Sequence, residues 1–373
     1  MWAGTGQEAT EDEKAKQMLI RKAAVIGAGT MGCGIATHLA NAGVACLLLD
    51  IVPEGEGDRS RISSDAIARA LKTKPAAFMD PADAALLSAG NIEDDLDALG
   101  ECDWIIEAVT ENLEVKREIY EKIAPHRRPG SIISSNTSGI SLGMLTEGFD
   151  DDFRSSFLVT HFFNPPRYMY LLELVRGPDT SDEVFSGIRD FAEARLGKGV
   201  VECKDTPNFI ANRIGVLCMG ASCVYQEETG LSIEEIDAIT GPIIGRPKTA
   251  TFKLHDLVGI DVALMVMKNV YDLVPDDESR ELFRAPAFLE RLVEEGKLGR
   301  KSGGGFYRKE GKDILVLDLD SFEYRAAREV SFASLESAKK AKGLAAKIQA
   351  LVSGGDAASG YVWKLLSETM LYS

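Results

Sequence analysis

The chain has 373 residues, and its 58 acidic side chains outnumber 42 basic ones, giving a formal net charge of −16. Contacts to nucleic-acid phosphates need clustered Lys and Arg, so this charge argues against nucleic-acid binding as the main role. The length exceeds one ordinary hydrophobic core, and we therefore expect at least two domains.

Residues 1–20 are acidic and polar, which predicts an N-terminal tail and not a signal peptide. No apolar run approaches the length that spans a membrane, so we expect no membrane span. The six cysteines are scattered and form no CxxC pair, which predicts reduced thiols in a cytoplasmic protein. The four histidines occupy unrelated positions and give no metal-ligand spacing.

The first apolar segment, residues 22–26, is predicted to be a strand that runs into the sequence GAGTMG. Gly27 permits a tight turn, Gly29 lets the backbone approach a pyrophosphate, and Gly32 lets the following helix pack closely. A second strand ends in Asp50, which can accept hydrogen bonds from ribose hydroxyls and would repel a 2′-phosphate. This order predicts dinucleotide binding, with NAD favoured over NADP. The alternative is a glycine-rich turn that binds no ligand.

Strands and helices are then predicted to alternate. The expected elements are a loop at 51–60, a helical region broken by prolines at 61–90, a strand at 103–109, a helix at 115–123 and a strand at 131–135. The alternation continues to about Lys204 and is typical of a doubly wound parallel sheet.

Residues 157–175 have the clearest catalytic pattern in the chain. Two apolar runs flank Pro165–Pro166, which predicts two buried strands joined by a turn. A chain reversal there can bring Glu173 beside His161, and a carboxylate that orients the imidazole makes it a useful general base near neutral pH. From this segment alone, a buried structural histidine with a surface glutamate is an equal alternative.

The pattern changes near residue 205, where we place a domain boundary. Pro207 is predicted to open a long helical run to Glu228, and further helices are predicted near 232–239, 256–274 and 285–296. Beyond Tyr307 the sequence predicts a strand at 312–320, a helix at 334–352 and a last helix from about residue 361.

The chain resembles the L-3-hydroxyacyl-CoA dehydrogenases, the NAD-dependent enzymes of the third step of fatty-acid β-oxidation, over about residues 20–308. Six motifs in the same order carry the resemblance: VIGAGTMG (25–32), EAVTENLEVK (107–116), SNTSGI (135–140), HFFNPP (161–166), KDTPNFIANRIG (204–215) and KSGGGFY (301–307). The resemblance implies a Rossmann-like doubly wound sheet over 21–204, followed by an all-α helical domain over 205–308. One departure is Asn208, where the family often has Gly.

The resemblance also implies roles at matching positions. His161 would take the proton of the substrate's 3-hydroxyl group, Glu173 would orient it, and Ser138 and Asn212 would hydrogen-bond the substrate oxygens. The residues implied to contact NAD are Gly27, Gly29, Thr30, Met31, Gly32, Asp50, Glu111, Lys116, Asn164 and Lys301. The substrate would be an acyl-CoA, with no metal required.

Simpler roles remain open for several of these residues. Ser138 could cap the next helix, Asn212 could be a polar position on an amphipathic helix, and Lys301 could be a solvated charge. The loop after the second strand is longer than the resemblance implies, so Lys72 and Lys74 are candidates only for contact with the CoA phosphates.

Two other functions remain as alternatives. One is an NAD-dependent dehydrogenase of a small hydroxy acid or sugar acid, because such relatives share the HFFNP motif. The other is a non-catalytic NAD(H)-sensing module, which accounts for the glycine turn but gives no reason for the pairing of His161 with Glu173.

The sequence of residues 309–373 predicts a linker and the start of a second, truncated helical unit. In this it resembles longer bacterial proteins of the family, which carry a further hydratase module. The apolar stripe of the last helix consists of Val362, Leu365, Leu366 and Met370. It must pack on the first helical unit, pair between chains or stay exposed. We therefore expect self-association through residues beyond 205, as a homo-oligomer, or intrachain packing with a missing C-terminal repeat.

Overall fold

The computed structural model describes residues 19–373, which form two compact units. The first unit ends at Ile210, and the second extends from Ala211 to Ser373. The division lies a few residues after the boundary predicted near 205. The predicted tail, residues 1–20, falls almost wholly outside the described residues.

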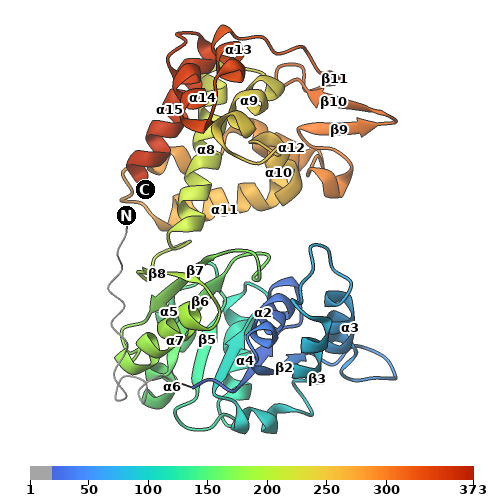
Figure 1. Cartoon of the computed structure of the whole chain (residues 1–373), viewed down its shortest axis with the longest axis vertical. Coiled ribbons are helices and arrows are strands. Elements are labelled where there is room, and N and C mark those ends of the chain that lie inside the picture. Colours follow the sequence, from blue (N-terminus) through green and yellow to red (C-terminus); the bar gives the residue numbers. More distant parts are fainter. Residues whose placement is uncertain (1–18) are drawn as a thin grey trace. The chain divides into compact units, whose positions relative to one another are not determined.

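The first unit is built on an eight-stranded sheet with the order β3-β2-β1-β4-β5-β6-β7-β8 (Figure 1). The strands are β1 (Lys22–Ile26), β2 (Ala45–Asp50), β3 (Leu87–Asn91), β4 (Trp104–Glu107), β5 (Ile132–Ser135), β6 (Phe157–Phe162), β7 (Leu171–Arg176) and β8 (Gly199–Cys203). Strands β1 to β6 pair in parallel, while β7 is antiparallel to β6. The first six strands have the order of a dinucleotide-binding sheet, whose switch point lies between β1 and β4.

Helices pack on both faces of this sheet. They are α2 (Thr30–Asn41), α3 (Arg61–Ala70), α4 (Leu113–Ile123), α5 (Leu142–Thr146), α6 (Asp151–Ser155) and α7 (Asp182–Ala194). Alternate residues of β1 face opposite sides: Val25 belongs to a core cluster with Ile35 of α2, and Ile26 to another with Ile119 of α4. The doubly wound α/β fold expected from the sequence is thus confirmed.

The prediction of a helical region over 61–90 was wrong in its second half. Helix α3 ends at Ala70, a 3-10 helix follows at Pro81–Leu86, and 87–91 form strand β3. The sequence LSAGN has little strand preference of its own. It forms a strand because its backbone pairs with β2 at the edge of the sheet.

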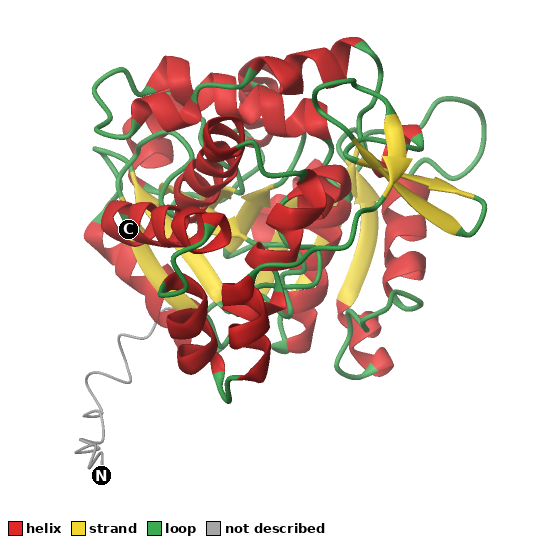
Figure 2. Cartoon of the chain, turned by 90° about the horizontal axis from the view of Figure 1, so that it is seen from above, coloured by secondary structure: helices red, strands yellow, loops and turns green. Residues whose placement is uncertain are grey.

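The second unit is mainly helical. Its helices are α8 (Ala211–Thr229), α9 (Ile233–Thr240), α10 (Phe252–Val258), α11 (Ile260–Leu273), α12 (Ala287–Glu294), α13 (Ala333–Lys340), α14 (Leu344–Val352) and α15 (Ala357–Tyr372). A three-stranded antiparallel sheet, yellow in Figure 2, consists of β9 (Tyr307–Glu310), β10 (Asp313–Leu317) and β11 (Tyr324–Ala326). The sheet starts where the predicted helical domain ends.

Two long helices predicted in this unit are each divided by a glycine. The helix expected over 256–274 is interrupted at Gly259, with φ +106°, and the helix expected over 334–352 is interrupted at Gly343, with φ +83°. Both values lie in the left-handed region, which glycine adopts at little cost and which a continuous α-helix excludes. Each glycine is the N-cap of the helix that follows it.

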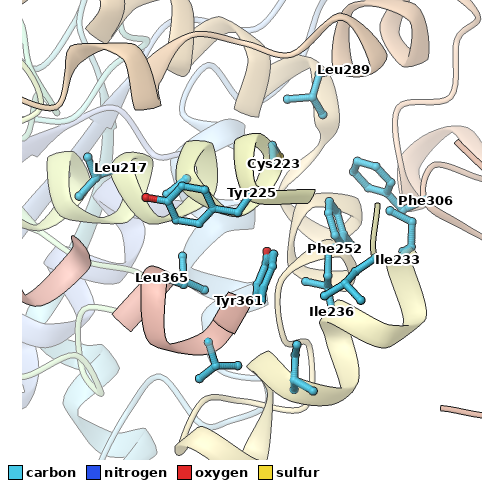
Figure 3. Close-up of a cluster of buried hydrophobic side chains, with 14 of the residues drawn as sticks. Leu217, Cys223, Tyr225, Ile233, Ile236, Phe252, Leu289, Phe306, Tyr361 and Leu365 are labelled. Carbon is cyan, nitrogen blue, oxygen red and sulfur yellow. The ribbon is translucent and has the colours of Figure 1, made fainter. Parts of the chain in front are cut away.

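Buried side chains from residues 309–373 belong to the core of the second unit, among them Val316, Leu335 and Leu351, which corrects the expected linker. Figure 3 shows Tyr361 and Leu365 of α15 facing Leu217 and Tyr225 of α8. The hydroxyl of Tyr361 donates a hydrogen bond to the carbonyl oxygen of Ser222 at 2.8 Å. The last helix thus completes a core within its own chain.

This packing removes the reason given above for self-association. In the predicted stripe, Val362 and Leu365 are fully buried against the first helices of the same unit, and Leu366 is partly buried there. Only Met370 remains largely exposed. The sequence left three possibilities open for this stripe: packing on the first helical unit, pairing between chains, or exposure. The structure shows the first.

Candidate functional site

His161 and Glu173 are direct neighbours across the antiparallel pair β6–β7. The His161 Nδ1 atom lies 2.7 Å from Glu173 Oε2, and both side chains are almost fully buried. The second carboxylate oxygen, Oε1, accepts a hydrogen bond from the Ile210 amide at 3.1 Å. The predicted contact between His161 and Glu173 is confirmed. A carboxylate at Nδ1 favours the tautomer with its proton on that nitrogen, and the role of His161 as a general base stays a prediction.

Aromatic rings enclose this imidazole. The ring of Phe163 lies 4.5 Å from the His161 ring, centroid to centroid, and that of Phe209 lies 5.7 Å away. Phe209 reaches this place because it and Asn208 adopt left-handed backbone conformations, with φ 47° and 60°. Asn tolerates this conformation better than most residues, so it can replace the glycine that the family often has.

The glycine turn joins β1 to α2 at the switch point of the sheet. Gly27 has φ +103°, and a Cβ atom on Gly32 would lie only 1.8 Å from the Gly27 carbonyl oxygen. In contrast, a Cβ on Gly29 would meet no atom within 4 Å, so open space adjoins this residue. Thr30 and Met31 form the first turn of α2, whose N-terminal amides favour an anion.

Asp50 ends β2 beside the glycine turn. Its Oδ2 atom accepts a hydrogen bond from the amide of Ala28, and Oδ1 accepts one from the amide of Ile51 at 2.7 Å. The carboxylate is thereby fixed next to the turn, where the sequence placed a ribose contact.

A chain of polar contacts links the buried Lys116 to the loop that carries Ser138. Lys116 Nζ lies 2.8 Å from Glu107 Oε1 and 3.3 Å from Glu111 Oε2, and the lysine is fully buried. Glu111 Oε1 in turn accepts hydrogen bonds from the Thr137 hydroxyl and the Ser138 amide. The next helix, α5, has Ser141 as its N-cap, so Ser138 is not a helix cap.

Glu107 is a site residue that the sequence reasoning did not select. It ends β4, is fully buried and accepts hydrogen bonds from Lys116, Tyr120 and Ser135 at 2.6–2.8 Å. A carboxylate at the end of an otherwise apolar strand was the signal that could have identified it. It neutralises Lys116 and holds that ammonium toward Glu111.

A pocket of about 480 Å³ opens between the glycine turn, α2, α3 and the turn after β6. The predicted residues Gly29, Thr30, Asn164 and Lys74 line it together. Lys72 does not, and it is exposed. Arg69, in the last turn of α3, lines the pocket and was missed, although it lies close in sequence to the two lysines.

Asn212 and Lys301 belong to the second unit. Asn212 lies in the first turn of α8, and Lys301 lies in a short 3-10 helix where its ammonium pairs with the carboxylate of Asp261. The pair is exposed to solvent, so a solvated charge remains open for Lys301. The ligand contacts expected of these two residues remain predictions.

Two further searches cover the described residues 19–373. No group of three or more His, Cys, Asp or Glu side chains there could hold a metal ion. Within the same range, no helix has the length and apolar character needed to cross a membrane.

Two family models match the chain. The 3-hydroxyacyl-CoA dehydrogenase NAD binding domain covers residues 22–206, and the 3-hydroxyacyl-CoA dehydrogenase C-terminal domain covers 209–309. A probable 3-hydroxyacyl-CoA dehydrogenase of Deinococcus radiodurans is 46% identical over 292 residues, which is 78% of this chain and 84% of that protein.

A probable 3-hydroxyacyl-CoA dehydrogenase of Bacillus subtilis is 47% identical over 368 residues, 95% of this chain. The chain spans only 46% of the length of that relative. Among solved structures, the (S)-3-hydroxybutyryl-CoA dehydrogenase of Ralstonia eutropha matches with a TM-score of 0.64 and 32% identity, over 77% of this chain and 98% of that one.

Proposed function

The chain belongs to the 3-hydroxyacyl-CoA dehydrogenase family, and we propose that it oxidises (S)-3-hydroxyacyl-CoA to 3-oxoacyl-CoA in fatty-acid β-oxidation. The observation that carries the proposal is the buried pair of His161 and Glu173, 2.7 Å apart at the end of β6. A structural role alone gives no reason to bury a carboxylate against an imidazole whose other nitrogen carries a free lone pair.

In this reaction the substrate loses a proton from its hydroxyl group and a hydride from C3. His161 Nε2 takes the proton, and Glu173 stabilises the imidazolium that forms. NAD, when bound, supplies the hydride acceptor. The protein's part is to hold the hydroxyl at Nε2 and C3 toward the cofactor, which is a matter of placement and electrostatics.

The residues of the first unit fit the dinucleotide. Gly29 leaves open space for a pyrophosphate at the start of α2, and Asp50 is held beside the turn for the ribose hydroxyls. We assign Glu111, Lys116 and the pocket residue Asn164 to the nicotinamide-ribose half. Lys301 of the second unit is assigned to the same half, on the family resemblance alone.

We propose that the acyl-CoA thioester and hydroxyl oxygens meet Ser138 and Asn212. The pocket of about 480 Å³ would receive the CoA part, because the cations Arg69 and Lys74 line it and phosphates need such groups locally in a chain of net charge −16. Lys72 is exposed outside this pocket and remains a weaker candidate.

The two alternative functions are less well supported. A sensing module gives no use for the buried pair of His161 and Glu173. A dehydrogenase of small hydroxy acids would not need a pocket with two cations beside the cofactor turn.

The test is a comparison of initial rates with NAD and either (S)-3-hydroxybutyryl-CoA or free 3-hydroxybutyrate. We expect turnover of the CoA ester and little of the free acid, and the reverse would favour the small-acid alternative. In His161→Ala we expect turnover to fall about 10³-fold, the usual contribution of a general base. NADH affinity should stay close to that of the native protein, because the glycine turn and Asp50 hold the cofactor.

A matched control is His126→Ala. His126 also pairs with a carboxylate, its Nδ1 lying 2.7 Å from Asp97 Oδ1, but this pair is on the surface. Turnover in the control should match that of the native protein. If both variants lose activity alike, or if His161→Ala loses NADH affinity as strongly as turnover, His161 is structural.

We also propose that the protein acts in the cytoplasm and self-associates through its second unit. The six free thiols suit a reducing compartment, and apolar side chains remain exposed on α10 and α11, among them Leu257, Val258 and Met265. Cell fractionation tests the first proposal. Sedimentation over a wide concentration range tests the second, and a monomer throughout would contradict it.

A further inference from the structure

The turn that connects β6 to β7, residues 163–170, determines how the catalytic pair is presented. It joins the strand of His161 to the strand of Glu173 and carries Asn164. Prolines 165 and 166 have no amide hydrogen, so this turn has fewer internal donors than most. Its own backbone supplies two hydrogen bonds, from the amides of Tyr168 and Met169 to the carbonyl of Pro165.

Lys198, just before β8, supplies donors to this turn from outside. Its ammonium group donates hydrogen bonds to the carbonyl oxygens of Pro166 and Met169, the latter at 2.8 Å. It also lies 5.7 Å from the ring centre of Phe162, at the end of the His161 strand. Three contacts of one side chain therefore converge on the turn and on the strand before it.

The surroundings of Lys198 are unusual for a lysine. The residue is only 4% exposed, and no acidic side chain in the described chain forms an ion pair with it. Burial lowers the pKa of Lys198 to about 8. An ammonium group held in this way costs free energy, which main-chain carbonyls offset only where they accept directly from it.

Neighbouring contacts show that this part of the turn is held closely. The amide of Gly199 donates to the Tyr170 carbonyl at 2.9 Å, and a Cβ on Gly34 of α2 would lie 2.8 Å from the Pro166 ring. Lys198 completes this set because it is the side chain that reaches both Pro166 and Met169.

We propose that Lys198 is a positioning residue for catalysis, which fixes the 163–170 turn and thereby the placement of Asn164 and of the His161–Glu173 pair. Its ammonium does not touch the reacting atoms and acts through the main chain of the turn. In its catalytic part the inference rests on the proposed dehydrogenase function.

The first test measures turnover in Lys198→Met, which keeps the length of the side chain and removes its donors. We expect kcat with (S)-3-hydroxybutyryl-CoA to fall at least ~10-fold, because small displacements of catalytic groups have large effects on rate. The affinity for NADH should fall less than kcat, because Gly27, Gly32 and Asp50 hold the cofactor independently of Lys198. Lys198→Arg keeps the charge and the donors and should recover part of kcat.

The matched control is Arg195→Met. Arg195 is also a cation that donates to a main-chain carbonyl, that of Ala42 at 3.2 Å, but it is exposed and contacts neither the turn nor the catalytic pair. Its kcat should equal that of the native protein. An unchanged kcat in Lys198→Met would overturn the inference, and so would equal losses of kcat, NADH affinity and melting temperature, which indicate a general structural defect.

The second test needs no substrate. Amide hydrogen exchange of peptides covering 163–170 should be faster in Lys198→Met than in the native protein, and unchanged in Arg195→Met. If the native protein fails to oxidise any acyl-CoA, the proposed function fails, while exchange still decides whether Lys198 holds the turn. Unchanged exchange in Lys198→Met would overturn that role regardless of the activity.

Discussion

At the scale of single residues, the catalytic pair depends on which tautomer of His161 is present. Glu173 accepts from Nδ1 with one oxygen and from the Ile210 amide with the other, so its position is fixed from two sides. A carboxylate at residue 173 favours the tautomer of His161 that carries its proton on Nδ1.

We expect Glu173→Gln to reduce turnover by about 10²–10⁴-fold. The glutamine amide would donate to Nδ1 and so select the tautomer with a proton on Nε2, which cannot act as a base. The imidazolium that forms on proton transfer also loses its counter-charge. Steady-state rates with (S)-3-hydroxybutyryl-CoA measure the loss, and turnover equal to that of the native protein would contradict the pairing.

A second histidine, His38 on α2, concerns stability and not catalysis. Burial lowers its pKa to about 4, and the charge of Lys198 adds to this effect. In the unfolded chain the imidazole takes a proton below about pH 6.5. Between these two values the unfolded state binds more protons, so acidification through this window destabilises the folded protein.

This group alone should reduce the free energy of unfolding by about 3 kcal/mol as the pH falls from 6.5 to 4. In His38→Leu we therefore expect a smaller loss of stability over the same window, measured by urea unfolding at several pH values. Parallel curves for the native protein and His38→Leu would show that His38 is not involved.

At the scale of elements, some helices and strands follow from their local sequence, while others form only through contacts with distant segments. The glycine turn, α4 and the strands of the sheet centre were predicted because their apolar patterns and turn residues agree. Strand β3 was not, because it is a strand only through its pairing with β2. Helix α8 begins at Ala211 and not at Pro207, because the preceding residues adopt left-handed conformations that place Phe209 in the core of the first unit.

In the turn between β1 and α2, Gly32 should be needed for both folding and NADH binding, and Gly29 for NADH binding alone. Gly32→Ala brings a methyl group against the Gly27 carbonyl, so we expect loss of both thermal stability and NADH binding. Gly29→Ala meets no protein atom and should leave the melting temperature within about 2 °C of the native value while NADH binding falls. Thermal melting and NADH titration separate the two cases, and equal destabilisation by both changes would contradict this account.

At the scale of the whole molecule, each unit has a core of its own. In the second unit the last helix, α15, is part of that core and not an appendage. Tyr361 is buried there, with its hydroxyl on the Ser222 carbonyl and its ring edge-on to Tyr225. Residues beyond the last family motif are therefore needed to complete the helical unit.

We expect Tyr361→Ala to reduce the free energy of unfolding of this unit by about 3–5 kcal/mol, because it leaves a large cavity. Tyr361→Phe should lose about 1 kcal/mol, the usual contribution of one hydrogen bond. Trp363→Ala, on the exposed side of the same helix, should change it by less than about 0.5 kcal/mol. Chemical denaturation of the three variants provides the measurement, and a neutral Tyr361→Ala would show that α15 is dispensable.

The sequence by itself determined the features that depend on local pattern. These are the doubly wound sheet and the glycine turn with its acid at the end of β2. The pairing of His161 with Glu173 was predicted beside an equal structural alternative, and the fold decided it. In the first two cases the signal lies within a few tens of residues and each residue type has a clear physical use, such as a glycine with φ +103°.

The tertiary structure decided what depends on contacts between distant segments. Glu107, Arg69 and Lys198 each acquire their role from neighbours that the fold brings to them. The fate of the last helix was likewise undecided, because an apolar stripe does not specify its partner. Burial and hydrogen bonding are properties of an environment, and that environment exists only once the chain has folded.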